Sequence, residues 1–206
     1  MLAMLMLLLG TTFAGHDWNT GSMGNQLLFE PRRARVWTAK LAAVVLLAAG
    51  LAAVVLFAYW TGLYAVASVR DLPIPDHAMV AAYKQAVLGT LFAAGGAAFG
   101  YALTMLLRST VGTLGILFAA GFLGIVIVGA MGIESAEQVM PWGNFVAFVV
   151  GGYTYYAYGD CAAGFPDGGC NPAHLIDRVH GTIYFLVVLA AVAVPSFVSF
   201  LKRDVP

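Results

Sequence analysis

The sequence predicts an all-α fold, a polytopic membrane helix bundle of about five spans, because 61% of its residues are apolar and only 10% are charged. A typical soluble domain has roughly 45–50% apolar and about 25% charged residues. The apolar residues also gather in long stretches separated by short polar segments, which is typical of membrane helices. We therefore expect residues 1–206 to form a single transmembrane domain.

Four stretches are long and apolar enough to cross about 30 Å of hydrocarbon as helices. They are Leu41–Leu63, Gln85–Leu107, Val111–Met131 and Thr182–Leu201. The stretch Met1–Ala14 is too short alone, so we expect it to end an incomplete first span whose beginning this chain lacks. Gly96 and Gly100 form a G-x-x-x-G pattern, which predicts close helix packing within or between subunits.

The distribution of Lys and Arg predicts the orientation, because these residues are held on the cytoplasmic side during insertion. If the spans alternate, seven of the cations fall on one side: Arg32, Arg33, Arg35, Lys40, Arg108, Lys202 and Arg203. Only Arg70, Lys84 and Arg178 fall on the other side. We expect a multi-pass protein of the cell (plasma) membrane with segment 15–38, the Arg108 turn and the C-terminus in the cytoplasm. The formal net charge of zero gives no reason to expect a nucleic-acid partner.

Residues 132–181 form the outer-face segment between the last two expected spans. Within it, the apolar but short stretch Val139–Val150 has Pro141 near its start, which favours a re-entrant or interfacial helix; a plain ordered loop is the alternative. Cys161 and Cys170 lie in a Gly- and Pro-rich loop that is flexible enough to close a disulfide. An oxidising outer face would preserve that bond, in agreement with the orientation from the charges.

The other polar and aromatic residues near the ends of the spans each allow a functional and a purely structural interpretation. A zinc site from Cys161, Cys170, His174 and His180 does not have the spacing of a known module, so we expect no metal. For Glu134 and Glu137 the alternatives are a cation site, repulsion of anionic substrates or simple solvation. For Asp177 and Arg178 they are a local ion pair or solvated charges. Aromatic residues at the outer ends of two spans anchor them at the lipid headgroups or line a pathway; they are Tyr59, Trp60, Tyr64 and Tyr83.

Segment 15–38 is the most informative polar stretch. Its middle predicts a short helix that is capped by Asn19 or Thr20 and ends before Pro31. We expect this helix to lie along the membrane surface with Met23, Leu27 and Leu28 as its apolar contacts. A surface helix of this kind can dock into another protein.

In this segment the chain resembles the membrane-spanning subunits of ABC type-2 exporters, particularly bacterial half-permeases. The matching order is an acidic residue, Gly-Ser, a Leu pair, proline and a basic residue: Asp17, Gly21, Ser22, Leu27, Leu28, Pro31 and Arg35. The resemblance implies that Trp18–Phe29 is a coupling helix that fits a cleft on a separate ABC ATPase subunit. It also implies a second permease subunit, as a homo- or heterodimer, and a pathway for export through the lipid bilayer.

The sequence has no G-x-x-x-x-G-K-[ST] motif, so we expect the chain to bind no ATP by a P-loop and no cofactor of its own. ATP would be bound and hydrolysed by the partner subunit, and this chain would not be an enzyme. Two other classes stay open. One is a non-transporting membrane scaffold or assembly protein, and the other is a small lipid-modifying enzyme that uses Glu134, Glu137 or His174.

Overall fold

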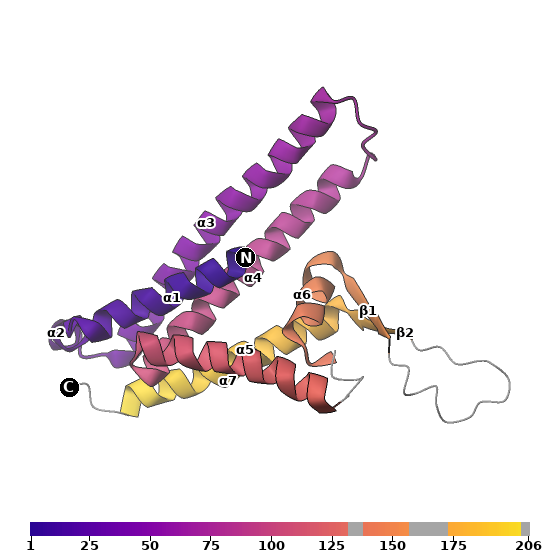
Figure 1. Cartoon of the computed structure of the whole chain (residues 1–206). Coiled ribbons are helices and arrows are strands. Elements are labelled where there is room, and N and C mark those ends of the chain that lie inside the picture. The colour runs from indigo at the N-terminus through magenta and orange to yellow at the C-terminus, as the bar shows by residue number, and fades with distance from the viewer. Residues whose placement is uncertain (132–137, 157–172, 203–206) are drawn as a thin grey trace. The chain divides into compact units, whose positions relative to one another are not determined.

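The computed structural model describes residues 1–131, 138–156 and 173–202. In these ranges the chain is mostly helical, with seven helices and one two-stranded sheet (Figure 1). The helices are α1 (Leu2–Asn19), α2 (Ser22–Phe29), α3 (Arg33–Val69), α4 (Ala78–Leu107), α5 (Thr110–Met131), α6 (Pro141–Val150) and α7 (Arg178–Lys202). The strands are β1 (Gly152–Tyr156) and β2 (Ala173–Asp177).

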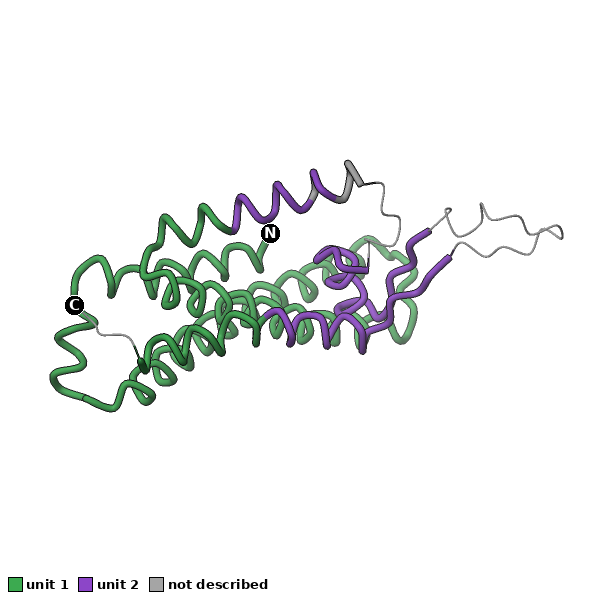
Figure 2. Tube along the Cα trace, turned by 90° about the horizontal axis from the view of Figure 1, so that it is seen from below, with its two compact units in different colours: residues 1–116, 189–206 green, residues 117–188 purple. Residues whose placement is uncertain are grey.

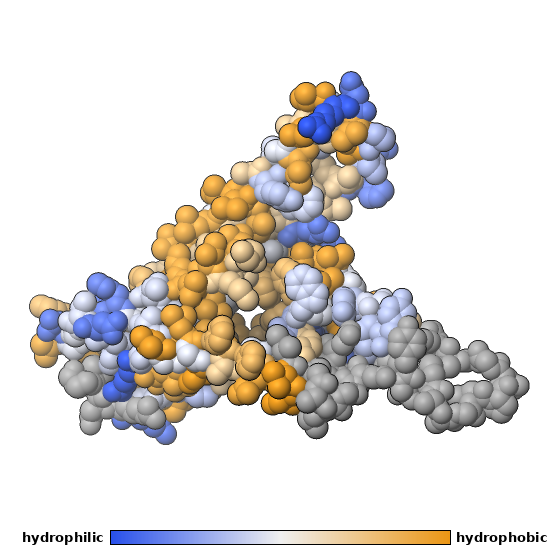
Figure 3. All heavy atoms as spheres, viewed as in Figure 1, coloured by the Kyte–Doolittle hydropathy of each residue, from blue (hydrophilic) through white to orange (hydrophobic). Residues whose placement is uncertain are grey.

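The four expected spans each lie within one helix, namely α3, α4, α5 and α7. In the described part of the chain, three helices are long and apolar enough to cross a membrane: α3, α4 and α7. This indicates a membrane protein, and the count of five spans stays a prediction. Figure 3 shows hydrophobic residues along the visible length of α3.

Helix α3 is longer than its apolar stretch because local signals, and not hydropathy, set its ends. It has 37 residues, so it is about 55 Å long at 1.5 Å per residue, well beyond the hydrocarbon thickness. Its C-terminus is a Schellman motif, in which Leu72 N donates to Ala67 O (3.0 Å) and Asp71 N to Ser68 O (3.2 Å). Asp71 has a φ of 52° at the position where glycine is usual.

The chain divides into two compact units, which Figure 2 colours separately. Unit 1 comprises residues 1–116 and 189–206, and unit 2 comprises residues 117–188. The two units are described one after the other, and the segment that resembles a coupling helix lies in unit 1.

In unit 1, α1 packs against α4 through glycines on both helices. A Cβ atom on Gly10 would lie 2.0 Å from the Ala97 carbonyl oxygen, and one on Gly100 would lie 2.3 Å from Leu7 O. A Cβ on Gly96 would lie 3.1 Å from Ala3 O. Gly96 and Gly100 therefore face α1 within the same chain, and the two backbones approach too closely for larger residues at Gly10 and Gly100.

An aromatic cluster joins three helices at one end of unit 1. Trp37, near the beginning of α3, packs edge-on against Tyr101 of α4, with centroids 5.7 Å apart, and against Phe197 of α7, with centroids 5.1 Å apart. The Tyr101 hydroxyl donates to the Trp37 carbonyl oxygen at 3.0 Å. The last turns of α7 and the beginning of α3 therefore lie at the same end of this unit, and the orientation expected from the charges stays a prediction.

Unit 2 contains α6 and the antiparallel pair β1–β2, in which Tyr155 pairs with His174. The apolar helix expected over 139–150 is present as α6, which begins at Pro141, the first helical position where proline is favoured. The small sheet was not predicted, so the expected all-α fold is corrected to a helical fold with one two-stranded sheet. Tyr153, Thr154 and Tyr155 of β1 are residues that favour strands, and Tyr153 pairs with Ile176 of β2.

Candidate functional site

Segment 15–40 is a helix–turn–helix–turn connection at one end of unit 1. Helix α1 does not end at Ala14 but continues to Asn19, and Gly21 (φ 67°) then turns the chain into α2. The short helix expected before Pro31 is therefore present, as Ser22–Phe29. Its predicted cap is wrong, since Gly21 occupies the N-cap position and Thr20 instead ends α1. The N-cap position has a left-handed backbone conformation, which favours glycine over a residue with a capping hydroxyl.

Asp17 connects the three helices of this segment. Its Oδ2 atom, on α1, forms an ion pair with the Lys40 ammonium group on α3. Its Oδ1 atom accepts a hydrogen bond from Ser22 Oγ, on α2, at 2.9 Å. The Asp17 and Lys40 side chains are only 13% and 15% exposed, so the pair is largely shielded from solvent. This one carboxylate therefore fixes the position of α2 relative to both neighbouring helices.

Helix α2 has one buried face and one exposed face. Met23 is 1% exposed and belongs to the same core cluster as Trp37 and Tyr101, and Leu27 packs against this cluster. Leu28 is 82% exposed and Phe29 is 91% exposed. Of the expected contacts, Met23 and Leu27 therefore anchor the helix, while Leu28 extends outward together with Phe29 and presents apolar surface beside polar residues.

The connection from α2 to α3 is charged and exposed. Glu30 Oε2 pairs with Arg35 Nη1 at 2.7 Å, and Glu30 Oε1 accepts from the Arg32 backbone N–H at 3.2 Å. The Arg35 side chain is 59% exposed. Pro31 is exposed in the short loop, where it prevents α2 from continuing into α3.

The end of α1 also contacts the turn between α4 and α5. Trp18 Nε1 donates to Met105 Sδ at 3.4 Å, and the Arg108 guanidinium carbon lies 4.8 Å from the centroid of the Trp18 ring. A Cβ on Gly15 would lie 1.8 Å from Thr110 Oγ1, so the α1 backbone lies directly on the start of α5. Sequence reasoning identified Trp18 but treated Arg108 only as an orientation signal, and it did not identify Gly15, Met105 or Thr110.

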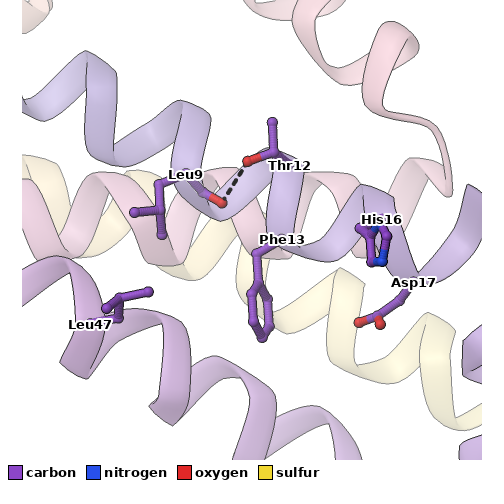
Figure 4. Close-up of a pocket in the computed structure, with 6 residues that line it drawn as sticks. All are labelled: Leu9, Thr12, Phe13, His16, Asp17 and Leu47. Atoms are coloured by element: carbon purple, nitrogen blue, oxygen red, sulfur yellow. Dashed lines mark hydrogen bonds between the residues drawn. The ribbon is translucent and has the colours of Figure 1, made fainter.

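An open groove of about 460 Å³ lies between α1 and α3 and reaches Asp17. Figure 4 shows Phe13 extending from α1 between Leu9 and the His16–Asp17 end. The lining residues are Leu9, Thr12, Phe13, His16, Asp17 and Leu47. The groove is apolar along most of its length, and it explains why the Asp17 carboxylate keeps a small exposed fraction.

In unit 2, Asp177 and Arg178 bind backbone groups. Asp177 Oδ1 accepts from the His180 backbone N–H at 2.9 Å, which caps the beginning of α7. Arg178 donates to Phe148 O at 3.1 Å and to Val150 O at 3.3 Å, at the C-terminal end of α6. These contacts differ from the expected local pair, and they hold α6 against α7.

The other candidates in segment 132–181 are only partly described. Glu134, Glu137, Cys161 and Cys170 lie outside the described residues, so the expected disulfide and the cation hypothesis stay predictions. The ring of His174 stacks on that of Tyr155 with centroids 5.3 Å apart, whereas His180 is exposed. Within the described ranges, no group of three or more His, Cys, Asp and Glu side chains could hold a metal ion.

The aromatic residues near the α3–α4 connection form contacts with each other. Tyr83 stacks on Phe57, with centroids 5.5 Å apart, and its hydroxyl lies 3.2 Å from Thr61 Oγ1. Tyr59 and Tyr64 are 57% and 42% exposed, and Tyr59 packs edge-on against Trp60. Lys84 is exposed on the first half of α4. These positions are compatible with anchoring at a lipid headgroup layer.

No protein-family model matches the chain, and neither a curated protein nor a solved structure is detectably similar to it. The functional assignment therefore depends on the residues and contacts described above.

Proposed function

We propose that this chain is the permease subunit of an ABC exporter in the cell membrane. In this proposal, α2 is a coupling helix that docks on a separate ATPase subunit at the cytoplasmic side. A second permease subunit completes the pathway, and nucleotide-driven movement of the ATPase pair changes the side of the membrane to which the pathway opens. The chain itself catalyses no reaction.

The observation that carries the proposal is the fixation of α2 by Asp17. A coupling helix transmits force only if it moves as a rigid body with the spans to which it is connected. Asp17 binds Ser22 on α2 and Lys40 on α3, and Met23 of α2 is buried in the core cluster. A displacement of α2 would therefore be passed to both α1 and α3 with little loss in flexible linkers.

The exposed residues of α2 supply the docking surface. Leu28 and Phe29 present adjacent apolar side chains, which favour insertion into an apolar cleft on a partner. Arg35 and Glu30 follow directly, and such rim charges orient an encounter more than they strengthen it. Burial of the two apolar side chains would contribute roughly 1.5–3 kcal/mol each to docking.

Purification in mild detergent tests the proposal. We expect a tagged wild-type chain to carry an ATPase subunit with it and to show vanadate-sensitive ATP hydrolysis. Leu28→Asp should remove this activity, because it places a charge where the apolar cleft would receive Leu28. Val69→Asp is the matched control, since Val69 is 84% exposed at the other end of α3 and should keep the activity.

Chemical labelling tests the side of the membrane. In a chain whose Cys161 and Cys170 are replaced by serine, a membrane-impermeant maleimide should label Leu28→Cys in inside-out vesicles and not in intact cells. Labelling of intact cells would overturn the proposed function. The same would follow if the wild-type chain purified without ATP hydrolysis, or if Leu28→Asp retained it.

A further inference from the structure

Arg108 has a backbone conformation that arginine rarely adopts. It follows the last residue of α4 with a φ of 56°, and its N–H donates to Thr104 O at 2.7 Å, which is the αL form of a helix C-cap. Glycine is the usual residue there, because a side chain strains the left-handed conformation. Ser109 follows as the cap of α5, its Oγ accepting from Gly112 N at 3.1 Å. The turn between α4 and α5 is therefore short and fixed at both ends.

The side chain of Arg108 makes a contact that glycine would not make. Its guanidinium group lies over the Trp18 ring, 4.8 Å from the centroid, and the indole N–H of the same ring donates to Met105 Sδ. Arg is the more frequent cation in cation–π contacts, and Trp is the ring that attracts a cation best. Trp18 is thus held from two sides by residues at the end of α4.

A second contact joins the same two regions through the backbone. Gly15 lies against the Thr110 side chain so closely that a Cβ at this position would approach Thr110 Oγ1 to 1.8 Å. The end of α1 is therefore fixed to α4 by Trp18 and to α5 by Gly15. Asp17 lies between these two residues in the sequence and fixes the same turn of α1 to α2 and α3.

We propose that Arg108 is a positioning residue that joins the α4–α5 turn to segment 15–40, so that displacement of α2 moves α4 and α5 together with α1 and α3. This inference rests on the proposed function and deepens it, since it names the contact that carries the movement to the second pair of helices. A general preference for positive charge at this turn would explain why position 108 is basic. It would not explain why Arg108 adopts a strained backbone conformation and lies over the Trp18 ring.

Hydrogen–deuterium exchange of the chain in lipid nanodiscs tests the link without any partner. The variants are Arg108→Gly and the matched control Asp71→Gly, which removes a side chain from the other non-glycine residue with positive φ in the described ranges. Loss of the cation–π contact should accelerate amide exchange in residues 16–29 about fivefold or more in Arg108→Gly. Asp71→Gly should leave this segment unchanged and should not melt below the wild type, because it relieves backbone strain.

The link must also be visible from the other side. Trp18→Leu should accelerate exchange in residues 108–113, since the contact is mutual. The proposal is overturned if Arg108→Gly leaves residues 16–29 at the wild-type rate. It is equally overturned if exchange rises evenly over all helices, because Arg108 would then have only a general structural role.

A second measurement separates this inference from the proposed function. If an ATPase subunit copurifies with the wild-type chain, the quantity to measure is the factor by which this chain stimulates its rate of ATP hydrolysis. Arg108→Gly should lower this stimulation about fivefold or more, and Asp71→Gly should leave it unchanged. If the wild-type chain carries no ATPase, the proposed function fails, and the exchange rates alone decide whether Arg108 joins the two regions.

Discussion

The Asp17–Lys40 pair gives the sharpest test of how segment 15–40 is held. We expect Asp17→Ala and Lys40→Ala to destabilise the protein individually, and the double substitution to cost little more than either one. Each single change leaves a shielded charge without its partner, whereas the double change removes both charges. The difference between the double substitution and the sum of the singles therefore measures the pair itself.

The expected magnitude follows from the burial of the two side chains. Breaking a fully buried pair costs about 3–5 kcal/mol, and an exposed pair contributes roughly 0.2–1 kcal/mol. Asp17 and Lys40 are 13% and 15% exposed, and Ser22 would still bind Asp17 after loss of Lys40. The long Lys40 side chain can also reach toward solvent after loss of Asp17. We therefore expect each single substitution to cost about 2–3 kcal/mol and the coupling energy to be about 2 kcal/mol.

Equilibrium unfolding in mixed detergent micelles, followed by tryptophan fluorescence, measures these free energies, since Trp18 and Trp37 belong to or pack against the same core cluster. The Glu30–Arg35 pair is the internal control. Its side chains are 36% and 59% exposed, so its coupling energy should stay below about 0.5 kcal/mol. Additive effects of Asp17→Ala and Lys40→Ala, or equal coupling energies for the two pairs, would refute the reasoning.

Three further predictions use the same unfolding assay or amide exchange. Gly10→Ala should lower the free energy of unfolding by about 2 kcal/mol or more, because its Cβ would lie 2.0 Å from Ala97 O. Gly62→Ala is the control and should be neutral or stabilising, because nothing lies within 4 Å of its Cβ. Equal effects of the two substitutions would contradict close α1–α4 packing. Arg178→Ala should cost about 2 kcal/mol and accelerate exchange in residues 148–151 but not in α1, because two hydrogen bonds to α6 carbonyls are lost. Tyr101→Phe should cost about 1 kcal/mol through loss of the bond to Trp37 O, and Trp37→Ala about 3–5 kcal/mol through loss of the ring contacts; the reverse order would show that the hydroxyl, and not ring packing, holds this end.

The positions of the long helices were predictable from the sequence, but their ends were not. Hydropathy marks the part of a helix that suits lipid, and the stretch Leu41–Leu63 lies inside α3. The helix itself begins at Arg33, after Pro31 has interrupted α2, and it ends at the Schellman motif around Asp71. These local signals are independent of hydropathy, so an apolar window underestimates the helix at both ends.

The contacts of the candidate site depend on distant partners that a local pattern cannot supply. The sequence places Asp17, Trp18 and Lys40 in one informative segment, but the polar residues after Ala14 suggested that the apolar helix ended there. Helix α1 continues because Lys40 pairs with Asp17 and because Trp18 packs at the end of α4. Neither partner follows from the spacing of residues along α1.

The small sheet had a signal in only one of its strands. The run Gly152–Tyr156 contains three tyrosines and a threonine, all of which favour strands. Its partner, Ala173–Asp177, has no comparable composition and follows after a long connection, so it pairs only because the tertiary fold brings it into register. In unit 2 this strand leads directly into Arg178, which places the guanidinium group against the end of α6.

The Lys and Arg residues that count equally in the prediction of orientation therefore differ in their contacts with other helices. Arg32 and Arg35 are exposed, and any basic residue there would give the same count of charges. Lys40 and Arg108 also contribute to that count, but each is held in a contact with α1, one with Asp17 and the other with Trp18. These two contacts involve consecutive residues on one helical turn and reach α3 in one direction and the α4–α5 turn in the other. Movement imposed on α2 would reach both helix pairs through that single turn of α1, and Lys40 and Arg108 are the cations whose loss should impair this transmission.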